Sequence, residues 1–155
     1  MTKEEKINQK KELKAICITL VETRVSNALQ AMNQAQEAAN SEEKSSAGDK
    51  YETGRAMSQR ERDMNAMQWK EANKELLFLK SIDIDKIYEC AESGAIIKSN
   101  DHTYFIAVGI GSIIYNEQKV FVISAKAPLA SLLIGKKKGE EFVFHEKRIK
   151  IETVY

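Results

Sequence analysis

The chain of 155 residues is long enough for one domain of ordinary size, or for a small domain with an extended element. Its 24 Lys and Arg residues nearly balance its 23 Asp and Glu residues, which leaves a net charge of +1. The overall electrostatic field is therefore too weak to indicate a nucleic-acid or membrane partner, so any such partner must be recognised by a local patch.

The N-terminal sequence, MTKEEKINQKKELK, contains no apolar core of a signal peptide. No apolar run approaches the ~20 residues that a membrane-spanning helix needs. The two cysteines, Cys17 and Cys90, lie in unrelated contexts without metal-ligating neighbours, and free thiols of this kind suit a reducing compartment. The sequence therefore predicts a cytoplasmic protein without a membrane segment.

The composition of the chain changes near Ile82. Before this point there is no proline, and the only two glycines are Gly48 and Gly54, among many good helix formers. After it come β-branched residues, aromatics, most of the glycines and the single proline, Pro128. This change predicts a domain boundary between residues 1–82 and residues 83–155.

Apolar and small residues in the first half recur at alternating steps of three and four, which is the pattern of a helical seam. The first seam consists of Ile18, Val21, Val25, Ala28, Met32, Ala35 and Ala39. A second, weaker seam consists of Met57, Met64, Met67 or Trp69, Ala72, Leu76 and Leu79. Two helices with one seam each and a short connection can bury those seams only against each other. The pattern therefore predicts an antiparallel coiled-coil hairpin with its tip at about residues 40–54.

The second half contains six short apolar or alternating runs separated by turn signals, as expected for strands. These runs are AIIKS, TYFIAVGI, SIIYN, KVFVISA, EEFVFH and RIKIETVY. The segment PLASLLIG differs, because Pro128 opens it and Gly135 closes it in the manner of a short helix. We expect a small, mainly antiparallel sheet with this helix packed on it, and Leu132 or Leu133 as its core anchor. The fold class is α+β.

Few residues in the sequence suggest catalysis. His102 and His145 both lie in turn-like contexts without a neighbouring Cys, His or paired acid, so we expect them to be solvated. No Ser/His/Asp or Cys/His set is evident. The second half of the chain therefore gives no indication of an enzyme.

The connection between the two helices, SSAGDKYETG, carries Asp49 and Glu52 three residues apart. Asp49 is a good N-cap residue, and an acid three residues later completes a capping box. The same spacing also places both carboxylates on one face of a helix, where hard oxygen ligands suit Mg²⁺. The local sequence leaves both interpretations open.

Two stretches of the chain resemble bacterial transcript cleavage factors of the GreA/GreB family. The tip segment GDKYETGRA is similar to the family's G-D-x-x-E-N-A signature, with Asp49 and Glu52 at its two acids. The segment VFVISAKAPLASLLIGKKKGEEFVF is similar to the family's I-S-x-x-S-P-L-x-x-A-L-L-G-K-x-x-G-D-x-V segment. The resemblance covers nearly the whole chain and implies an FKBP-like domain over residues 83–155.

The resemblance implies a transcription elongation factor that is not itself an enzyme. Members of the family dock at the rim of the secondary channel of RNA polymerase and reach its catalytic centre with the coiled coil. By this resemblance, Asp49 and Glu52 would support the second Mg²⁺ of the polymerase, near the 3′ end of backtracked nascent RNA, and the chain would hold no cofactor of its own. The implied polymerase-docking residues are Pro128, Leu129, Gly135 and Lys136. The residues suggested to steer the tip toward RNA phosphates are Lys44, Lys50 and Arg55.

Other functions remain open, because the tip departs from the family signature and because other classes of protein share parts of this architecture. Thr53-Gly54 stands where the family has Asn-Ala, and a glycine inside a helix costs up to about 1 kcal/mol relative to alanine. The family includes relatives that bind polymerase without stimulating cleavage, or that inhibit it, and this change keeps that function open. A peptidyl-prolyl isomerase is suggested only by the FKBP-like architecture. A purely structural coiled-coil dimer would leave the acidic tip without a role, and we expect a monomer.

Overall fold

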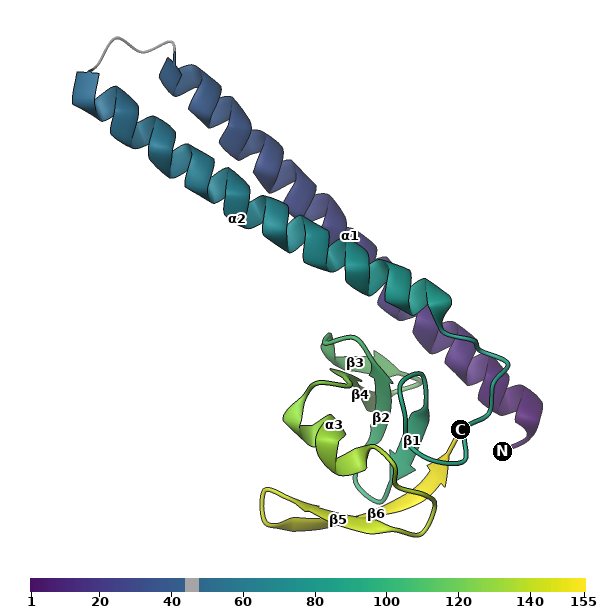
Figure 1. Cartoon of the computed structure of the whole chain (residues 1–155). Coiled ribbons are helices and arrows are strands. Elements are labelled where there is room, and N and C mark those ends of the chain that lie inside the picture. Colours follow the sequence, from purple (N-terminus) through teal and green to yellow (C-terminus); the bar gives the residue numbers. More distant parts are fainter. Residues whose placement is uncertain (44–47) are drawn as a thin grey trace. The chain divides into compact units, whose positions relative to one another are not determined.

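The computed structural model of the chain describes residues 1–43 and 48–155, with side chains described outside residues 42–52. Two long helices come first, α1 (Lys3–Glu43) and α2 (Gly48–Ser81), and a β sheet with one short helix follows (Figure 1). This architecture confirms the predicted helical hairpin and small β domain. None of the helices in the described ranges has an apolar stretch long enough to cross a membrane.

The chain divides into two compact units. The first, here called the β unit, comprises Met1–Cys17 and Phe78–Tyr155. The second, here called the distal hairpin, comprises Ile18–Leu77. The start of α1 and the end of α2 therefore group with the sheet, a feature that the composition change near Ile82 does not indicate.

In the distal hairpin the two helices run antiparallel side by side (Figure 1). The predicted seam of α1 is confirmed: Val21, Ala28, Ala35 and Ala39 are all buried. Residues seven apart fall on the same stripe of a coiled-coil helix, and this stripe changes from valine at position 21 to alanine at positions 28 and 35, nearer the connection with α2. Little apolar area is buried there, so the end next to the connection is the less stable end.

The predicted seam of α2 is wrong in its distal half. Met57, Met64 and Met67 are 63%, 61% and 70% exposed, so they do not face α1. The buried residues Leu79 and Ala72 are seven apart, and continuing this period leads to Asn65 and Ser58, which are half-buried. The methionines at 57 and 64 precede the true seam by one residue, which turns them toward solvent. Polar residues occupy the inner positions instead.

The six strands form one sheet in the order β3-β4-β2-β1-β6-β5. Their bounds are β1 (Ile96–Ser99), β2 (Thr103–Ala107), β3 (Gly111–Tyr115), β4 (Gln118–Ser124), β5 (Glu141–Phe144) and β6 (Lys147–Val154). All six predicted strands are present. The pairing of β2 with β4 is parallel, whereas the other neighbours are antiparallel, because β4 inserts between β2 and β3. The alternation of a strand carries no information about its partner, so this insertion was not predictable from the pattern.

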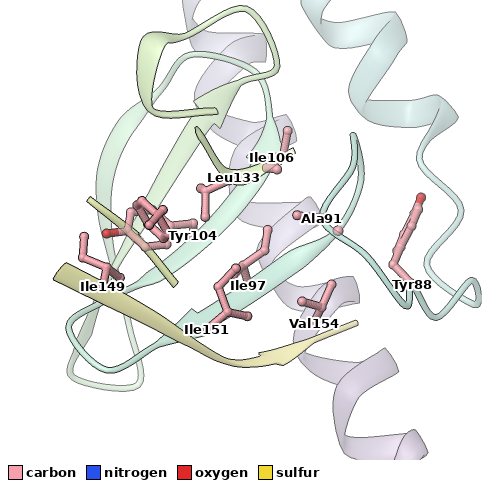
Figure 2. Close-up of a cluster of buried hydrophobic side chains, with 11 residues drawn as sticks. Tyr88, Ala91, Ile97, Tyr104, Ile106, Leu133, Ile149, Ile151 and Val154 are labelled. Atoms are coloured by element: carbon pink, nitrogen blue, oxygen red, sulfur yellow. The ribbon is translucent and has the colours of Figure 1, made fainter. Parts of the chain in front are cut away.

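The helix α3 (Pro128–Leu133) lies over one face of the sheet (Figure 1), and its Leu133 side chain belongs to the main core of the β unit (Figure 2). Leu133 is fully buried in this core, whereas Leu132 is 37% exposed, so Leu133 is the anchor that the sequence predicted at one of the two positions. The core is made of side chains from the sheet, from α3 and from the segment before β1. Its fully buried members include Ala91, Ile97, Ile106, Leu133 and Ile151.

The opposite face of the sheet is also buried. Ile96, Phe105 and Val122 alternate with the residues of the main core and are at most 1% exposed. The start of α1 belongs to the same compact unit, and the Tyr155 hydroxyl donates a hydrogen bond to Gln9 Oε1 of that helix. The β unit therefore has three layers, with α3 on one side of the sheet and the start of α1 on the other.

Candidate functional site

The two candidate tip acids lie in the first two turns of α2. The described helix begins at Gly48, so Asp49 is its second residue, inside the helix rather than at the N-cap that the sequence suggests, and Glu52 is its fifth. The side chains of both acids, and of Lys50, lie outside the part of the chain whose side chains the structure describes, and Lys44 lies outside the described residues altogether. The backbone alone places the two acids three residues apart in a helix, which puts both on one face.

Polar contacts join the two helices of the distal hairpin. Arg24 of α1 and Glu75 of α2 form an ion pair with a distance of 3.2 Å between Nη1 and Oε2. Nearer the connection, Arg62 of α2 donates a hydrogen bond of 2.9 Å to Gln36 Oε1 of α1. These contacts join the two helices in their antiparallel arrangement, but they are partly exposed, so each contributes little to stability.

Among the predicted RNA-steering residues, Arg55 is the one whose side chain is described. Arg55 lies on α2 and is half-buried, and it interacts with another group of the protein, so it is not a free side chain. Arg60, one turn further along, is exposed. Because Lys44 and the side chain of Lys50 lie outside the described part of the chain, the predicted grouping of Lys44, Lys50 and Arg55 stays a prediction.

The four predicted docking residues lie on α3 and the turn after it. Pro128 is the first helical residue and is exposed, as its fixed φ and missing N–H favour. Leu129 is half-buried against the main core. Gly135 has φ +87°, a conformation that glycine adopts without strain, and its N–H donates to the Ala91 carbonyl at 2.7 Å.

The backbone of Lys136 is also tied to the segment before β1. Its carbonyl accepts a hydrogen bond of 2.8 Å from the Ala91 N–H, and its own N–H donates to Leu133 O at 3.0 Å. Gly135 and Lys136 therefore have a clear structural role, which is to fasten the end of α3 to the β unit. The Lys136 side chain remains half-exposed.

Sequence reasoning missed two exposed apolar residues of the same segment. Leu132 is 37% exposed and Ile134 is 44% exposed, and both lie within a few residues of Pro128 and Lys136. The signal was present in the sequence, because a six-residue helix that buries Ala130 and Leu133 must turn Leu132 outward. The end of α3 therefore presents apolar side chains next to a basic turn.

A second group that sequence reasoning missed lies in the turn between β1 and β2. The Asp101 side chain is 9% exposed, and its Oδ1 accepts hydrogen bonds from the Ser99 hydroxyl and, at 2.7 Å, from the His102 N–H. The Tyr104 hydroxyl donates to the same carboxylate at 3.3 Å. Burial opposes ionisation, but the hydrogen bonds from Ser99 and His102 outweigh it and lower the pKa of Asp101.

His102 is therefore more than a solvated turn residue. Its Nδ1 lies 3.2 Å from Asp101 Oδ2, and its ring meets the Phe121 ring edge-on at a centroid distance of 4.9 Å. The hydrogen-bond partners of Asp101 come from the turn itself and from β1 and β2, and Lys147 Nζ of β6 lies 3.9 Å from Asp101 Oδ2. We interpret the group as a device that fixes the β1–β2 turn. The described residues contain no group of three or more His, Cys, Asp or Glu side chains that could hold a metal ion.

No model of a protein family matches the chain, and no curated protein matches it in sequence. Among solved structures, the chain is similar to the transcription factor Gfh1, with a TM-score of 0.37 and 11% identity. The superposition covers 89% of this chain and 92% of that one. Similarity at this level establishes neither a family nor an activity, so a function has to be argued from the residues of the chain itself.

Proposed function

We propose that the chain is an accessory transcription factor that binds RNA polymerase at its secondary channel and stimulates cleavage of backtracked nascent RNA. The observation that carries this proposal is the position of Asp49 and Glu52 in the first two turns of α2, next to the connection between the two long helices. Two carboxylates on one face suit Mg²⁺, which keeps most of its waters and takes one or two such ligands.

Two carboxylates do not by themselves make a two-metal hydrolytic site, so we assign the cleavage of the RNA to the polymerase. A Mg²⁺ ion held jointly by the two proteins would activate water and stabilise charge on the phosphate. Asp49 would contribute ligand oxygens, and Glu52 would orient the attacking water. In this role the chain is no enzyme and carries no cofactor of its own.

The distal hairpin supports this proposal through its dimensions. The 26 residues of α1 that belong to it, 18–43, span about 40 Å at 1.5 Å per residue. Ala28, Ala35 and Ala39 form its buried stripe, so the helices can approach closely where the hairpin nears its tip. A long, narrow element of this kind suits a channel better than a stable core would require.

The exposed side chains at the end of α3 support a docking role for the β unit. Pro128, Leu132 and Ile134 expose apolar atoms beside Lys136, whereas the buried Ala130 and Leu133 hold the helix on the sheet. Exposed apolar residues beside charged ones are typical of a protein-binding surface. We propose that this surface contacts the polymerase.

The test is RNA cleavage in stalled, backtracked elongation complexes, with and without the protein. Increased cleavage that depends on both polymerase and protein would support the proposal. The docking surface is tested with Ile134→Glu, which should weaken polymerase binding. The matched control is Val143→Glu, since Val143 is exposed to a similar extent, at 57%, but lies on β5.

Two outcomes would redirect the proposal. Binding to polymerase without increased cleavage would favour a regulator that inhibits or does not stimulate cleavage, in line with the glycine at position 54 in the first turns of α2. An absence of binding to core polymerase and to elongation complexes would overturn the proposal. Equal binding by Ile134→Glu and the unaltered protein would remove the docking role of α3.

A further inference from the structure

The strand β3 is an edge of the sheet, and on one of its faces the Tyr115 hydroxyl donates a hydrogen bond to Glu12 of α1. In the described chain it pairs with β4 alone, and none of its five residues is charged or a proline. Charges and prolines are the usual means by which proteins keep an edge from pairing with another chain. Ile114, within this strand, is 66% exposed. The other edge strand differs, because β5 begins with Glu141, whose Oε2 lies 3.6 Å from Arg148 Nε of β6.

The turn between β3 and β4 determines which backbone groups of β3 point outward. Asn116 and Glu117 both have positive φ and form a two-residue turn between the paired residues Tyr115 and Gln118. In such a hairpin the backbone groups of the two residues that flank the turn, Tyr115 and Gln118, hydrogen-bond to each other. Along β3, residues whose N–H and C=O face β4 then alternate with residues whose N–H and C=O point away from it. On β3 the outward-pointing residues are Ser112 and Ile114.

These two residues make β3 its own complement. If two copies of β3 meet antiparallel about a two-fold axis at Ile113, Ser112 of one copy lies opposite Ile114 of the other. Both pairs are then hydrogen-bonded pairs, because the outward groups of each strand meet those of its partner. No charge is brought opposite a like charge, since β3 contains none. Such a contact is isologous and closes after two copies.

We propose that β3 is a self-association surface, through which two copies of this chain join their sheets antiparallel about Ile113. A second copy is favoured over an unrelated strand because the outward groups and the side chains of β3 match those of the same strand reversed. The exposed Ile114 side chain gains cover from Ser112 and its neighbours on the other copy. The two six-stranded sheets become one continuous sheet.

The contact is small, which sets its expected strength. Stable protein interfaces bury roughly 1,200–2,000 Å², and a single five-residue strand provides only part of such an area. The dimer should therefore be weak, with a dissociation constant of about 0.1–1 mM. Self-association of this kind does not depend on polymerase binding, so it stands or falls separately from the proposed function.

Sedimentation of the full chain over a concentration series up to about 1 mM tests the proposal. Ile114→Lys places a gatekeeper charge on the edge and should weaken association about tenfold or more. The double variant Ser112→Glu with Ile114→Lys should restore most of the affinity at low salt, because each glutamate then faces a lysine of the other copy. Val143→Lys on β5 is the matched control and should associate like the unaltered protein.

Amide hydrogen exchange gives an independent readout of the same contact. With rising protein concentration, exchange at Ser112 and Ile114 should slow, while exchange at Ile113, whose N–H already bonds to β4, should stay unchanged. A chain that remains monomeric at about 1 mM would overturn the proposal. So would a dimer that Ile114→Lys leaves intact, or one without the alternating protection, because either result would place the contact elsewhere.

Discussion

The ammonium group of Lys10 lies 4.5 Å from the centroid of the Tyr88 ring, in a place where the lysine is fully buried and the tyrosine only 8% exposed. Lys10 Nζ also donates a hydrogen bond of 2.8 Å to the Lys86 carbonyl. Lys86 brings a second ammonium to within 4.6 Å of the same ring. One tyrosine of the segment before β1 thus joins that segment to the start of α1.

Lys10 should make the stability of the protein depend on pH in the mildly alkaline range. Burial lowers its pKa from 10.5 to about 8, with a further lowering from Lys86 and an opposing effect of Asp83. Between these two values the unfolded chain binds more protons than the folded one, so the free energy of unfolding should rise with pH above about 8. Lys10→Met should remove this rise in urea unfolding measured from about pH 7 to pH 9.

A matched control separates Lys10 from its neighbour one turn along the helix. Lys14 Nζ donates to the carbonyls of Lys80 and Ile82 at 3.1 and 2.8 Å, so it caps the end of α2. Lys14→Met should lower stability yet keep the dependence on pH. Above about pH 9 the effect of Cys17 opposes that of Lys10, because burial raises its thiol pKa to about 11 and the unfolded chain loses that proton first. An unchanged slope in Lys10→Met would show that the buried lysine is not the cause.

Leu133 and Leu132 should differ sharply in their contribution to stability. Leu133 is fully buried in the main core, and truncation of such a leucine to alanine typically costs about 2–5 kcal/mol. Leu132→Ala, at a position that is 37% exposed, should cost less than about 1 kcal/mol. Thermal unfolding of the two variants measures the difference. Equal midpoints would mean that α3 does not pack on the sheet as described.

The register of α2 can be tested by adding an apolar side chain to its true seam. Asn65 lies on the heptad that contains the buried Ala72 and Leu79, so Asn65→Leu should stabilise the distal hairpin by about 1 kcal/mol. Met64→Ala, one residue earlier and 61% exposed in the parent chain, should change stability by less than about 0.5 kcal/mol. Circular dichroism during thermal unfolding distinguishes the two. A loss of stability in Met64→Ala that is clearly larger than this limit would instead support the methionine seam that the sequence predicts.

The elements of the fold follow from local patterns, and the errors follow from information that such patterns lack. The seam from Val21 to Ala39 was predictable because small and apolar residues keep a strict period there. The methionines of α2 led to a wrong seam prediction, because an apolar side chain is not necessarily buried. The burial of Gln9 and Lys10 could not be predicted, since both are polar and their partners Tyr155 and Tyr88 lie far along the chain.

The candidate site was predictable to a different degree in each part. The acids at 49 and 52 were predicted from their spacing and from the family resemblance, and the structure adds that both lie in the first two turns of α2. The segment proposed to dock on the polymerase was predicted by resemblance, but its exposed apolar atoms come largely from Leu132 and Ile134. Gly135 turns out to have a structural role as well, since its positive φ ends α3.

Substitution of the two tip acids distinguishes metal binding from helix capping. Asp49 is the second residue of α2, so its capping role is limited to the favourable interaction of a carboxylate with the N-terminal end of the helix, about 0.3–1 kcal/mol. Asp49→Asn keeps the size of the side chain, so capping alone predicts a folded protein with full activity. A neutral amide binds Mg²⁺ far more weakly than a carboxylate, so metal binding predicts that stimulated RNA cleavage collapses while folding and polymerase binding remain.

Two further measurements make the tip experiment decisive. Raising the Mg²⁺ concentration should recover part of the activity of Asp49→Asn, because mass action compensates for a weakened ligand. Glu52→Gln should also lose stimulated cleavage, though less completely, since we assign it to orienting water. Circular dichroism and polymerase binding serve as controls for folding and docking. Full stimulation by Asp49→Asn at low Mg²⁺ would reduce the two acids to a helix cap and remove the chemical basis of the proposed function.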